Sequence, residues 1–155
     1  MDVNGMGNIW VIGAGLREGE LTLEAAQALK SGGKILLHTR HIGCADYLER
    51  CNIAFESLDE LYDECEDFDE HAARAAEAVA HAAEDGDVVY VVYDVRDRSV
   101  QRLMASGVKC RITAGPPVAG ALFGMLEGGT RLLEASDWES FRLSPMENAL
   151  IREIN

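Results

Sequence analysis

Two glycines near the amino terminus mark the first place where this sequence could bind a ligand. Gly13 and Gly15 close a short apolar run, residues 8–13, and are separated by Ala14. Because glycine has no side chain, such a turn can be tight and can let a ligand approach the backbone closely. The alternative is a turn that needs glycine only for its own geometry.

Charged side chains gather directly after a second apolar run, residues 88–93. The cluster consists of Asp94, Arg96, Asp97 and Arg98. In α/β proteins ligands bind beyond the carboxyl ends of parallel strands, so a charged cluster at such an end is a candidate functional site. The alternative is a set of solvated ion pairs, which contribute little to stability.

A third polar segment, residues 38–41, follows another apolar run. His38 and His41 flank Arg40, and these side chains could touch a ligand or only cap a strand. Arg40 could also meet the 2′-phosphate of NADP, because Gly19 extends the first turn to G-x-G-x-x-x-G, a spacing similar to that of nucleotide-binding turns. An NADP-binding Rossmann-type domain is therefore one hypothesis, and it requires Arg40 to face a groove beside residues 13–15.

Apolar runs of strand length alternate with segments of helical periodicity along most of the chain. Strands are expected at 8–13, 34–38, 53–55, 88–93 and 109–113, and helices at 21–29, 45–50, 68–84, 99–105 and 118–126. Strands joined through helices form right-handed crossovers and a parallel sheet. The pattern predicts an α/β fold with a mostly parallel five-stranded sheet, helices on both faces, and the run 88–93 at its centre.

Three loops leave the carboxyl ends of the expected strands. They comprise residues 13–20, 93–97 and 113–117. We expect a small-molecule ligand to bind where these loops meet.

The pattern changes after Gly128 and Gly129. The segments 130–134 and 149–154 have strand character and are separated by a turn region. We predict a first α/β domain at 1–127 and, at 128–155, the start of a second domain or a C-terminal extension. Trp138 and Phe141 in this tail either form an exposed apolar patch or pack under the sheet.

The net charge of the chain limits the classes of molecule that it is expected to bind. It has 27 acidic and 14 basic side chains, a formal net charge of −13, and the acid is concentrated between residues 56 and 70. Such a field repels the phosphodiester backbone, so we expect no nucleic-acid partner. In the segment 56–70 acidic residues alternate with apolar ones, which is typical of a half-buried amphipathic face.

The cysteines and the hydropathy of the sequence indicate in which cellular compartment the protein is expected. The four cysteines have irregular spacing, no C-x-x-C pair and no apolar signal segment ahead of them, which is typical of a cytoplasmic protein with reduced thiols. No apolar run approaches the ~20 residues that a membrane-spanning helix needs, so we expect no membrane partner. The cysteines and histidines also lack the spacing of structural zinc ligands, and we expect no metal site.

Taken in order, several segments resemble the N-terminal half of the tetrapyrrole (corrin/porphyrin) methylase family. The version that is fused to a nucleotide pyrophosphohydrolase domain is the most similar. The matching segments are 11–15 with 21–26, 37–41, 55–62, 88–92, 112–116 and Ala121. The resemblance covers essentially the whole chain, although each motif alone is short.

This resemblance implies a function as well as a fold. Members of the family have two α/β domains, usually dimerise, and bind S-adenosylmethionine between the domains to methylate a tetrapyrrole ring. Methyl transfer from a sulfonium depends mainly on positioning, with backbone carbonyls or an acidic group suited to the positive sulfur. By resemblance the cofactor-binding residues are Gly13, Ala14, Gly15, Asp94, Val95, Arg96, Ala114, Gly115 and Pro116, while the resemblance assigns no catalytic residue.

The chain departs from the family pattern in two loops. Leu16-Arg17-Glu18 stands where the family has Pro-Gly-Asp, and Asp94-Val95-Arg96 stands where it has Gly-Asp-Pro or Gly-His-Pro. We therefore expect a diverged and truncated version, a methyltransferase-like domain in which activity is either kept or lost. A non-catalytic binding or regulatory module that dimerises is the second hypothesis, beside the NADP-binding one.

Overall fold

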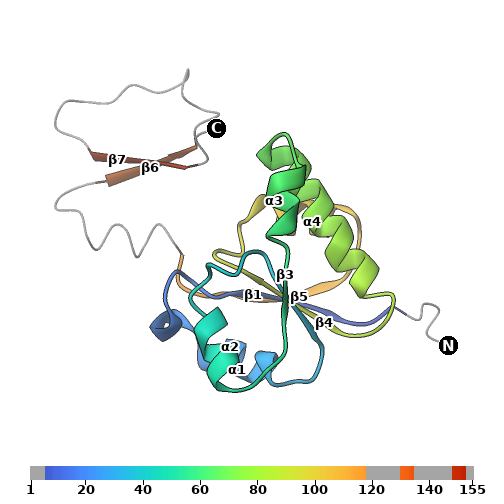
Figure 1. Cartoon of the computed structure of the whole chain (residues 1–155). Coiled ribbons are helices and arrows are strands. Elements are labelled where there is room, and N and C mark those ends of the chain that lie inside the picture. Colours follow the sequence, from blue (N-terminus) through green and yellow to red (C-terminus); the bar gives the residue numbers. More distant parts are fainter. Residues whose placement is uncertain (1–5, 118–129, 135–147, 153–155) are drawn as a thin grey trace. The chain divides into compact units, whose positions relative to one another are not determined.

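The computed structural model describes residues 6–117, 130–134 and 148–152 (Figure 1). The chain divides into two compact units, Met1–Pro117 and Val118–Asn155. The first unit contains the sheet that the sequence predicts. The predicted domain boundary between residues 127 and 128 lies outside the described residues and stays a prediction.

The first unit is built on a five-stranded sheet. Its strands are β1 (Ile9–Gly13), β2 (Lys34–Leu37), β3 (Glu56–Ser57), β4 (Val88–Val92) and β5 (Cys110–Thr113). Their order is β3-β2-β4-β1-β5, and every neighbouring pair is parallel. The prediction of a parallel α/β sheet is confirmed.

Strand β4 lies at the centre of this sheet, as its composition predicts. All five of its residues are buried, because it pairs with β1 on one side and with β2 on the other. Valine and tyrosine suit this position, since branched and aromatic side chains pack well between two covered faces. Tyr90 is 0% exposed and is among the largest fully buried side chains.

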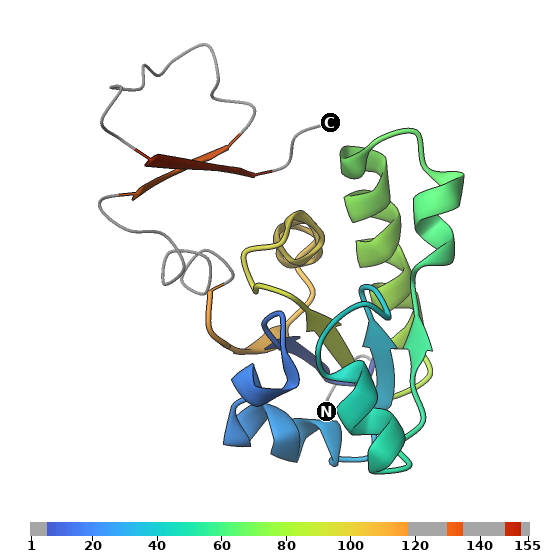
Figure 2. The same cartoon turned by 60° about the vertical axis from the view of Figure 1, so that its left-hand side comes forward.

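Helices cover both faces of the sheet (Figures 1 and 2). On one face α1 (Leu23–Leu29) and α2 (Ala45–Arg50) pack over Ile12, Leu37 and Val91. On the other, α4 (Phe68–Ala82) and α5 (Arg98–Ala105) pack over Val11 and Val92. The predicted positions of these four helices are confirmed, and each helix begins and ends within two residues of the expected position.

Side-chain caps account for where three of these helices begin. Thr22 accepts a hydrogen bond from the Ala25 amide at the start of α1, and Asp67 accepts one from Glu70 at the start of α4. Asp97 plays the same part for α5, accepting from Ser99. Such caps satisfy backbone amides that the first helical turn leaves unpaired.

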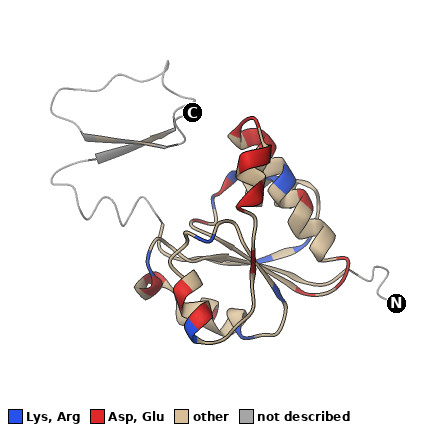
Figure 3. Ribbon diagram, in the orientation of Figure 1, with Lys and Arg blue, Asp and Glu red and all other residues tan. Residues whose placement is uncertain are grey.

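Three elements of the first unit differ from the prediction. The expected strand 53–55 is wrong by a few residues, because β3 is Glu56–Ser57 while Ile53 and Phe55 lie in the preceding turn and pack against the core. Two short helices were also not expected: a 3-10 turn, Glu18–Glu20, and α3 (Glu60–Glu64). Figure 3 shows acidic residues gathered over α3 and the start of α4.

The second unit contains two described strands. β6 (Thr130–Glu134) pairs in parallel with β7 (Asn148–Arg152), and Thr130 lies opposite Asn148. Both strands were predicted, the second with a slightly later start. The expected helix at 118–126, Trp138 and Phe141 lie outside the described residues.

Candidate functional site

The strand order brings the three predicted ligand loops to one edge of the sheet. β4, β1 and β5 are consecutive neighbours and run in the same direction, so residues 93–97, 14–17 and 114–117 leave adjacent strand ends. The first two loops remain joined beyond the strands, since Ala14 N donates to Val92 O at 2.9 Å and Gly15 N to Tyr93 O at 3.0 Å.

Gly13 and Gly115 allow the β1 and β5 loops to touch. A Cβ atom on Gly115 would lie 1.9 Å from the carbonyl oxygen of Gly13, and one on Gly13 would lie 2.9 Å from the amide nitrogen of Gly115. The methyl group of Val95, from the β4 loop, would be 3.1 Å from that second Cβ. The two glycines therefore fit a contact between loops, with Val95 closing it from the side.

The first loop is held by its own carboxylate. Gly15 adopts a positive φ of 69°, and Glu20 Oε2 accepts hydrogen bonds from Leu16 N at 2.6 Å and from Arg17 N at 3.2 Å. The Arg17 guanidinium pairs with the same carboxylate at 3.2 Å. Burial raises the pKa of Glu20, but these hydrogen bonds outweigh it and hold the pKa below its ordinary value of 4.5.

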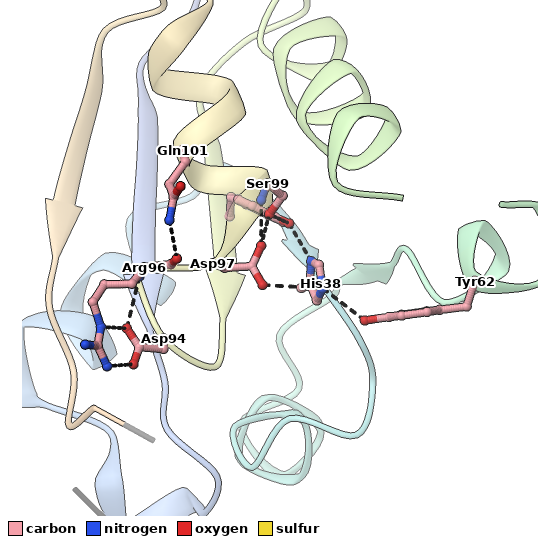
Figure 4. Close-up of polar contacts among 8 residues, drawn as sticks. His38, Tyr62, Asp94, Arg96, Asp97, Ser99 and Gln101 are labelled. Atoms are coloured by element: carbon pink, nitrogen blue, oxygen red, sulfur yellow. Dashed lines mark hydrogen bonds and ion pairs between the residues drawn. The ribbon is translucent and has the colours of Figure 1, made fainter. Parts of the chain in front are cut away.

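The β4 loop carries an ion pair within itself. Arg96 Nη2 lies 2.9 Å from Asp94 Oδ2, its Nε lies 3.2 Å from Asp94 Oδ1, and its backbone amide donates to the same oxygen at 3.0 Å. The Asp94 side chain is 11% exposed, whereas that of Arg96 is 50% exposed. Figure 4 shows this pair on one side of the connection and Asp97 pointing the other way.

The remaining members of the predicted site lie on the β5 loop. Ala114 is exposed, and Gly115 and Pro116 are partly buried. Thr113, the last residue of β5, is only 3% exposed, and its hydroxyl has no hydrogen-bond partner in the described part of the chain. An unpartnered buried hydroxyl is costly and is a feature that a bound polar group would satisfy.

Arg40 follows β2, a strand that is not the neighbour of β1. In the sheet β4 stands between β1 and β2, whereas the classic Rossmann order places the first two strands side by side. Arg40 instead forms an ion pair with Glu49 of α2, and its guanidinium lies 5.6 Å from the centre of the Phe55 ring. The sheet thus lacks the strand order that the NADP hypothesis assumes, and the Arg40 guanidinium already has a partner.

Beside the β4 loop, a buried hydrogen-bond network joins β2, β4 and α5. His38 Nδ1 lies 2.7 Å from the hydroxyl of Tyr90, and that hydroxyl lies 2.8 Å from Ser99 Oγ. Ser99 in turn donates to Asp97 Oδ1. His38 Nε2 lies 3.0 Å from Tyr62 of α3, which completes the chain (Figure 4). This cluster sits where ligands bind in parallel sheets, at the carboxyl ends of β2 and β4.

A second histidine packs against the same network. His71 of α4 stacks on the Tyr62 ring, with centroids 3.9 Å apart, and meets the His38 ring edge-on at 5.0 Å. It is 3% exposed, and its Nε2 has no hydrogen-bond partner within the described residues. Burial lowers the pKa of His38 and of His71, although Asp97 and Asp59 act in the opposite direction on both.

Sequence reasoning reached only part of this network. It singled out His38 and Asp97 as polar residues at strand ends, but it did not connect them with Tyr62, His71 or Tyr90. The signal available was a tyrosine inside an otherwise all-valine strand and a histidine inside an alanine-rich helix. Each of these is a polar group placed where apolar side chains prevail.

A pocket lies at the other end of the strands, beside the amino ends of β1, β4 and β5. Its volume is about 540 Å³, and it opens between Trp10, Asp87 and Arg111. Several of its polar side chains already have partners: Asp87 accepts two hydrogen bonds from Asn8. Arg111 lies 4.7 Å from the Trp10 ring centre and bonds Glu24. We therefore place the candidate site at the carboxyl ends.

The described residues contain neither a metal-binding cluster nor a membrane-spanning helix. Within residues 6–117 and the two described tail strands, no group of three or more His, Cys, Asp or Glu side chains is arranged to hold a metal ion. None of the described helices is long and apolar enough to cross a bilayer. All four cysteines are free thiols, and burial raises the pKa of Cys44 to about 12.

Comparison with solved structures identifies a protein of similar fold. It is described as a cobalamin synthesis related protein (CobF) from Corynebacterium diphtheriae, and the match covers 94% of this chain and 71% of that chain, with a TM-score of 0.51 and 19% sequence identity. The two proteins share a fold. The α/β architecture expected from the sequence is thereby confirmed, and at this identity the likeness extends to the fold alone. No family model and no curated protein sequence matches the chain.

Proposed function

We propose that the first unit binds S-adenosylmethionine at the carboxyl ends of β1, β4 and β5 and acts as a methyltransferase of the tetrapyrrole methylase type. The observation that carries this proposal is the strand order, because it makes neighbours of the three loops that the family resemblance assigns to the cofactor. The fold shared with CobF supports it. The homodimer, the cytoplasmic location and the likeness to the pyrophosphohydrolase-fused version stay predictions.

The residues at these loops suit the chemistry of the cofactor. S-adenosylmethionine carries a sulfonium and an amino-acid tail with one positive and one negative group. Asp94 and Arg96 offer the two complementary charges side by side, and the buried Thr113 hydroxyl offers a polar group that is unpartnered within the described residues. Asp94 would hold the ammonium of the tail and Arg96 its carboxylate.

The part of the protein in such a reaction is mainly positioning. When bound, the cofactor supplies the methyl group, and no obligatory acid is needed for its transfer. Gly13, Gly115 and Val95 hold three loops in mutual contact, while Glu20 fixes the backbone of the first loop. A rigid arrangement of this kind favours transfer because the reacting groups are held in line.

A binding or regulatory module without catalysis is the second candidate. The same contacts favour it, since the polar and backbone groups of the loops already engage one another: Asp94 pairs with Arg96, and Gly13 packs on Gly115. In this case the sheet would serve only as a scaffold, and the protein would dimerise through its second unit.

Calorimetric titration distinguishes these proposals. Purified protein is titrated with S-adenosylmethionine, S-adenosylhomocysteine and NADPH, and the methyltransferase proposal predicts micromolar binding of the first two. Asp94→Asn should weaken that binding about tenfold, because it removes the charge that meets the ammonium. Arg102→Ala, an exposed change on α5, should leave it unaltered. No heat with any ligand would favour the module, and heat with NADPH alone would revive the Rossmann hypothesis.

A further inference from the structure

The hydrogen bonds around His38 determine which of its ring nitrogens carries the proton. An ionised carboxylate can only accept hydrogen bonds, so the Ser99 hydroxyl donates its single proton to Asp97. In its contact with Tyr90, Ser99 must therefore be the acceptor. Tyr90 therefore has no proton left for His38 and accepts from Nδ1–H. Neutral His38 is thus protonated at Nδ1, and its Nε2 is a free acceptor.

The group that meets this acceptor is the phenol of Tyr62. The Tyr62 hydroxyl donates to His38 Nε2 at 3.0 Å, and its ring lies flat on His71, with an interplanar angle of 24°. His38 Nε2 is also 3.9 Å from Asp97 Oδ2, a distance at which the carboxylate acts by charge alone. Two imidazoles thus contact the Tyr62 ring, and the Asp97 carboxylate lies beside one of them, His38.

The helix that supplies Tyr62 is weakly held. α3 has five residues and buries none of them. Its N-cap residue, Asp59, makes no capping bond to the helix, and its carboxylate instead accepts a hydrogen bond from the Arg40 amide at 2.8 Å. Tyr62 itself is 40% exposed. Besides the Tyr62 contacts, α3 is tied to α4 by an exposed ion pair between Glu64 and Arg74, and exposed ion pairs contribute little to stability. An isolated single turn is marginal in water.

The two histidines that contact Tyr62 are, by contrast, buried, and one of them lacks a hydrogen-bond partner among the described residues. His38 and His71 are 6% and 3% exposed, and they project from β2 and α4, both packed in the core. His71 Nε2 lacks a hydrogen-bond partner in the described part of the chain. Unpaired buried polar atoms are rare in native folds, and a water, an ion or a ligand can supply the missing partner.

We propose that His38, His71 and Asp97 form a ligand subsite for an uncharged flat ring that bears a hydroxyl group, with Tyr62 as a displaceable internal occupant. The hydroxyl of the ligand donates to His38 Nε2, and its ring stacks on His71 in the place of the tyrosine. The nearby carboxylate of Asp97 disfavours anionic ligands such as phenolates and carboxylates. This subsite does not depend on the proposed cofactor.

The test uses phenol as the probe and needs no cofactor. In Tyr62→Ala, phenol should bind and shift the side-chain NMR signals of His38 and His71. Anisole, a ring of similar size without the donor, should bind about fivefold to tenfold more weakly, which is the worth of one hydrogen bond. The matched control is Tyr47→Ala, which opens space beside a half-buried tyrosine of α2, and there the two probes should bind alike.

The same measurements on the wild-type protein test whether a ligand can displace Tyr62. If Tyr62 is displaceable, phenol should bind more weakly than to Tyr62→Ala and should speed the hydrogen exchange of α3 amides. Equal binding of phenol and anisole to Tyr62→Ala would reduce the site to a plain apolar cavity and overturn the proposal. So would a folded Tyr62→Ala that binds no phenol, or a wild type whose α3 exchange is unaffected while the variant binds.

Discussion

Gly13, the last residue of β1, and Gly115, two residues after the end of β5, lie with their backbones in direct contact. A Cβ atom on Gly115 would meet the carbonyl oxygen of Gly13 at 1.9 Å, a distance that no side chain can occupy. The contact joins the ends of β1 and β5 on the edge where parallel sheets bind ligands. Both glycines are therefore required by the protein's own packing, whatever ligand the loops bind.

Gly115→Ala should push the two loops apart and destabilise the first unit. The atom in the way is backbone and cannot swing aside, so we expect a loss of about 1–3 kcal/mol in the free energy of unfolding, the usual range for overpacking. Urea denaturation measures it. The control is Gly19→Ala, where a Cβ would meet nothing within 4 Å, and a similar loss in both variants would contradict the contact.

The hydroxyl of Tyr90 should contribute to stability through His38 and Ser99. Tyr90→Phe leaves His38 Nδ1 and Ser99 with unmet hydrogen bonds in a buried place, at a cost of about 1–3 kcal/mol. Thermal and urea unfolding of Tyr90→Phe, Ser99→Ala and the double variant should show non-additive losses, because both changes break one network. Purely additive losses would argue against the network, and Tyr93→Phe, a half-buried tyrosine, is the control.

The two buried histidines should make stability depend on pH. Burial lowers the pKa of His38 and His71 in the folded state from 6.5, so the unfolded chain binds more protons just below that pH. The free energy of unfolding should therefore fall as the pH drops below about 6.5 and level off beneath the folded pKa values. Denaturant unfolding between pH 8 and about 5 measures it.

Variants separate this effect from the titration of other groups. The charged and titratable neighbours are Asp97, Asp59 and Tyr62 around both histidines, with Arg74 beside His71 and Tyr90 beside His38. His71→Phe retains a stacking ring and should flatten the pH dependence. His81→Gln, an exposed change on the same helix, should not. An unchanged profile in His71→Phe would show that the histidine does not titrate with folding.

Removal of the Glu20 carboxylate should loosen the first loop. In Glu20→Ala the amides of Leu16 and Arg17 lose their acceptor, and their hydrogen exchange should accelerate, with a loss of roughly 1 kcal/mol in stability. Since the folded pKa of Glu20 lies below 4.5, the wild-type contribution is present above that pH and is lost as the pH falls through the folded value. Glu77→Ala, an exposed change, is the control.

The sequence alone determined most of the elements, because their signals are local. The valine-rich run at 88–92 predicts a buried strand wherever it lies, and Asp67 and Asp97 begin helices by bonding to amides three or two residues away. The sequence placed β3 a few residues too early and did not indicate α3. There the apolar residues serve the turn before the strand, and a single acidic helical turn has too few apolar positions to show a period.

The tertiary structure decided which of these elements meet. The order β3-β2-β4-β1-β5 depends on how each crossover passes the sheet. It places β4 between β1 and β2, and it brings Gly13 against Gly115. His38 and Tyr90 are 52 residues apart along the chain, and no propensity acts over that length. A site built from distant side chains exists only once the strands are ordered, because propensities act within a few residues whereas packing acts across the whole unit.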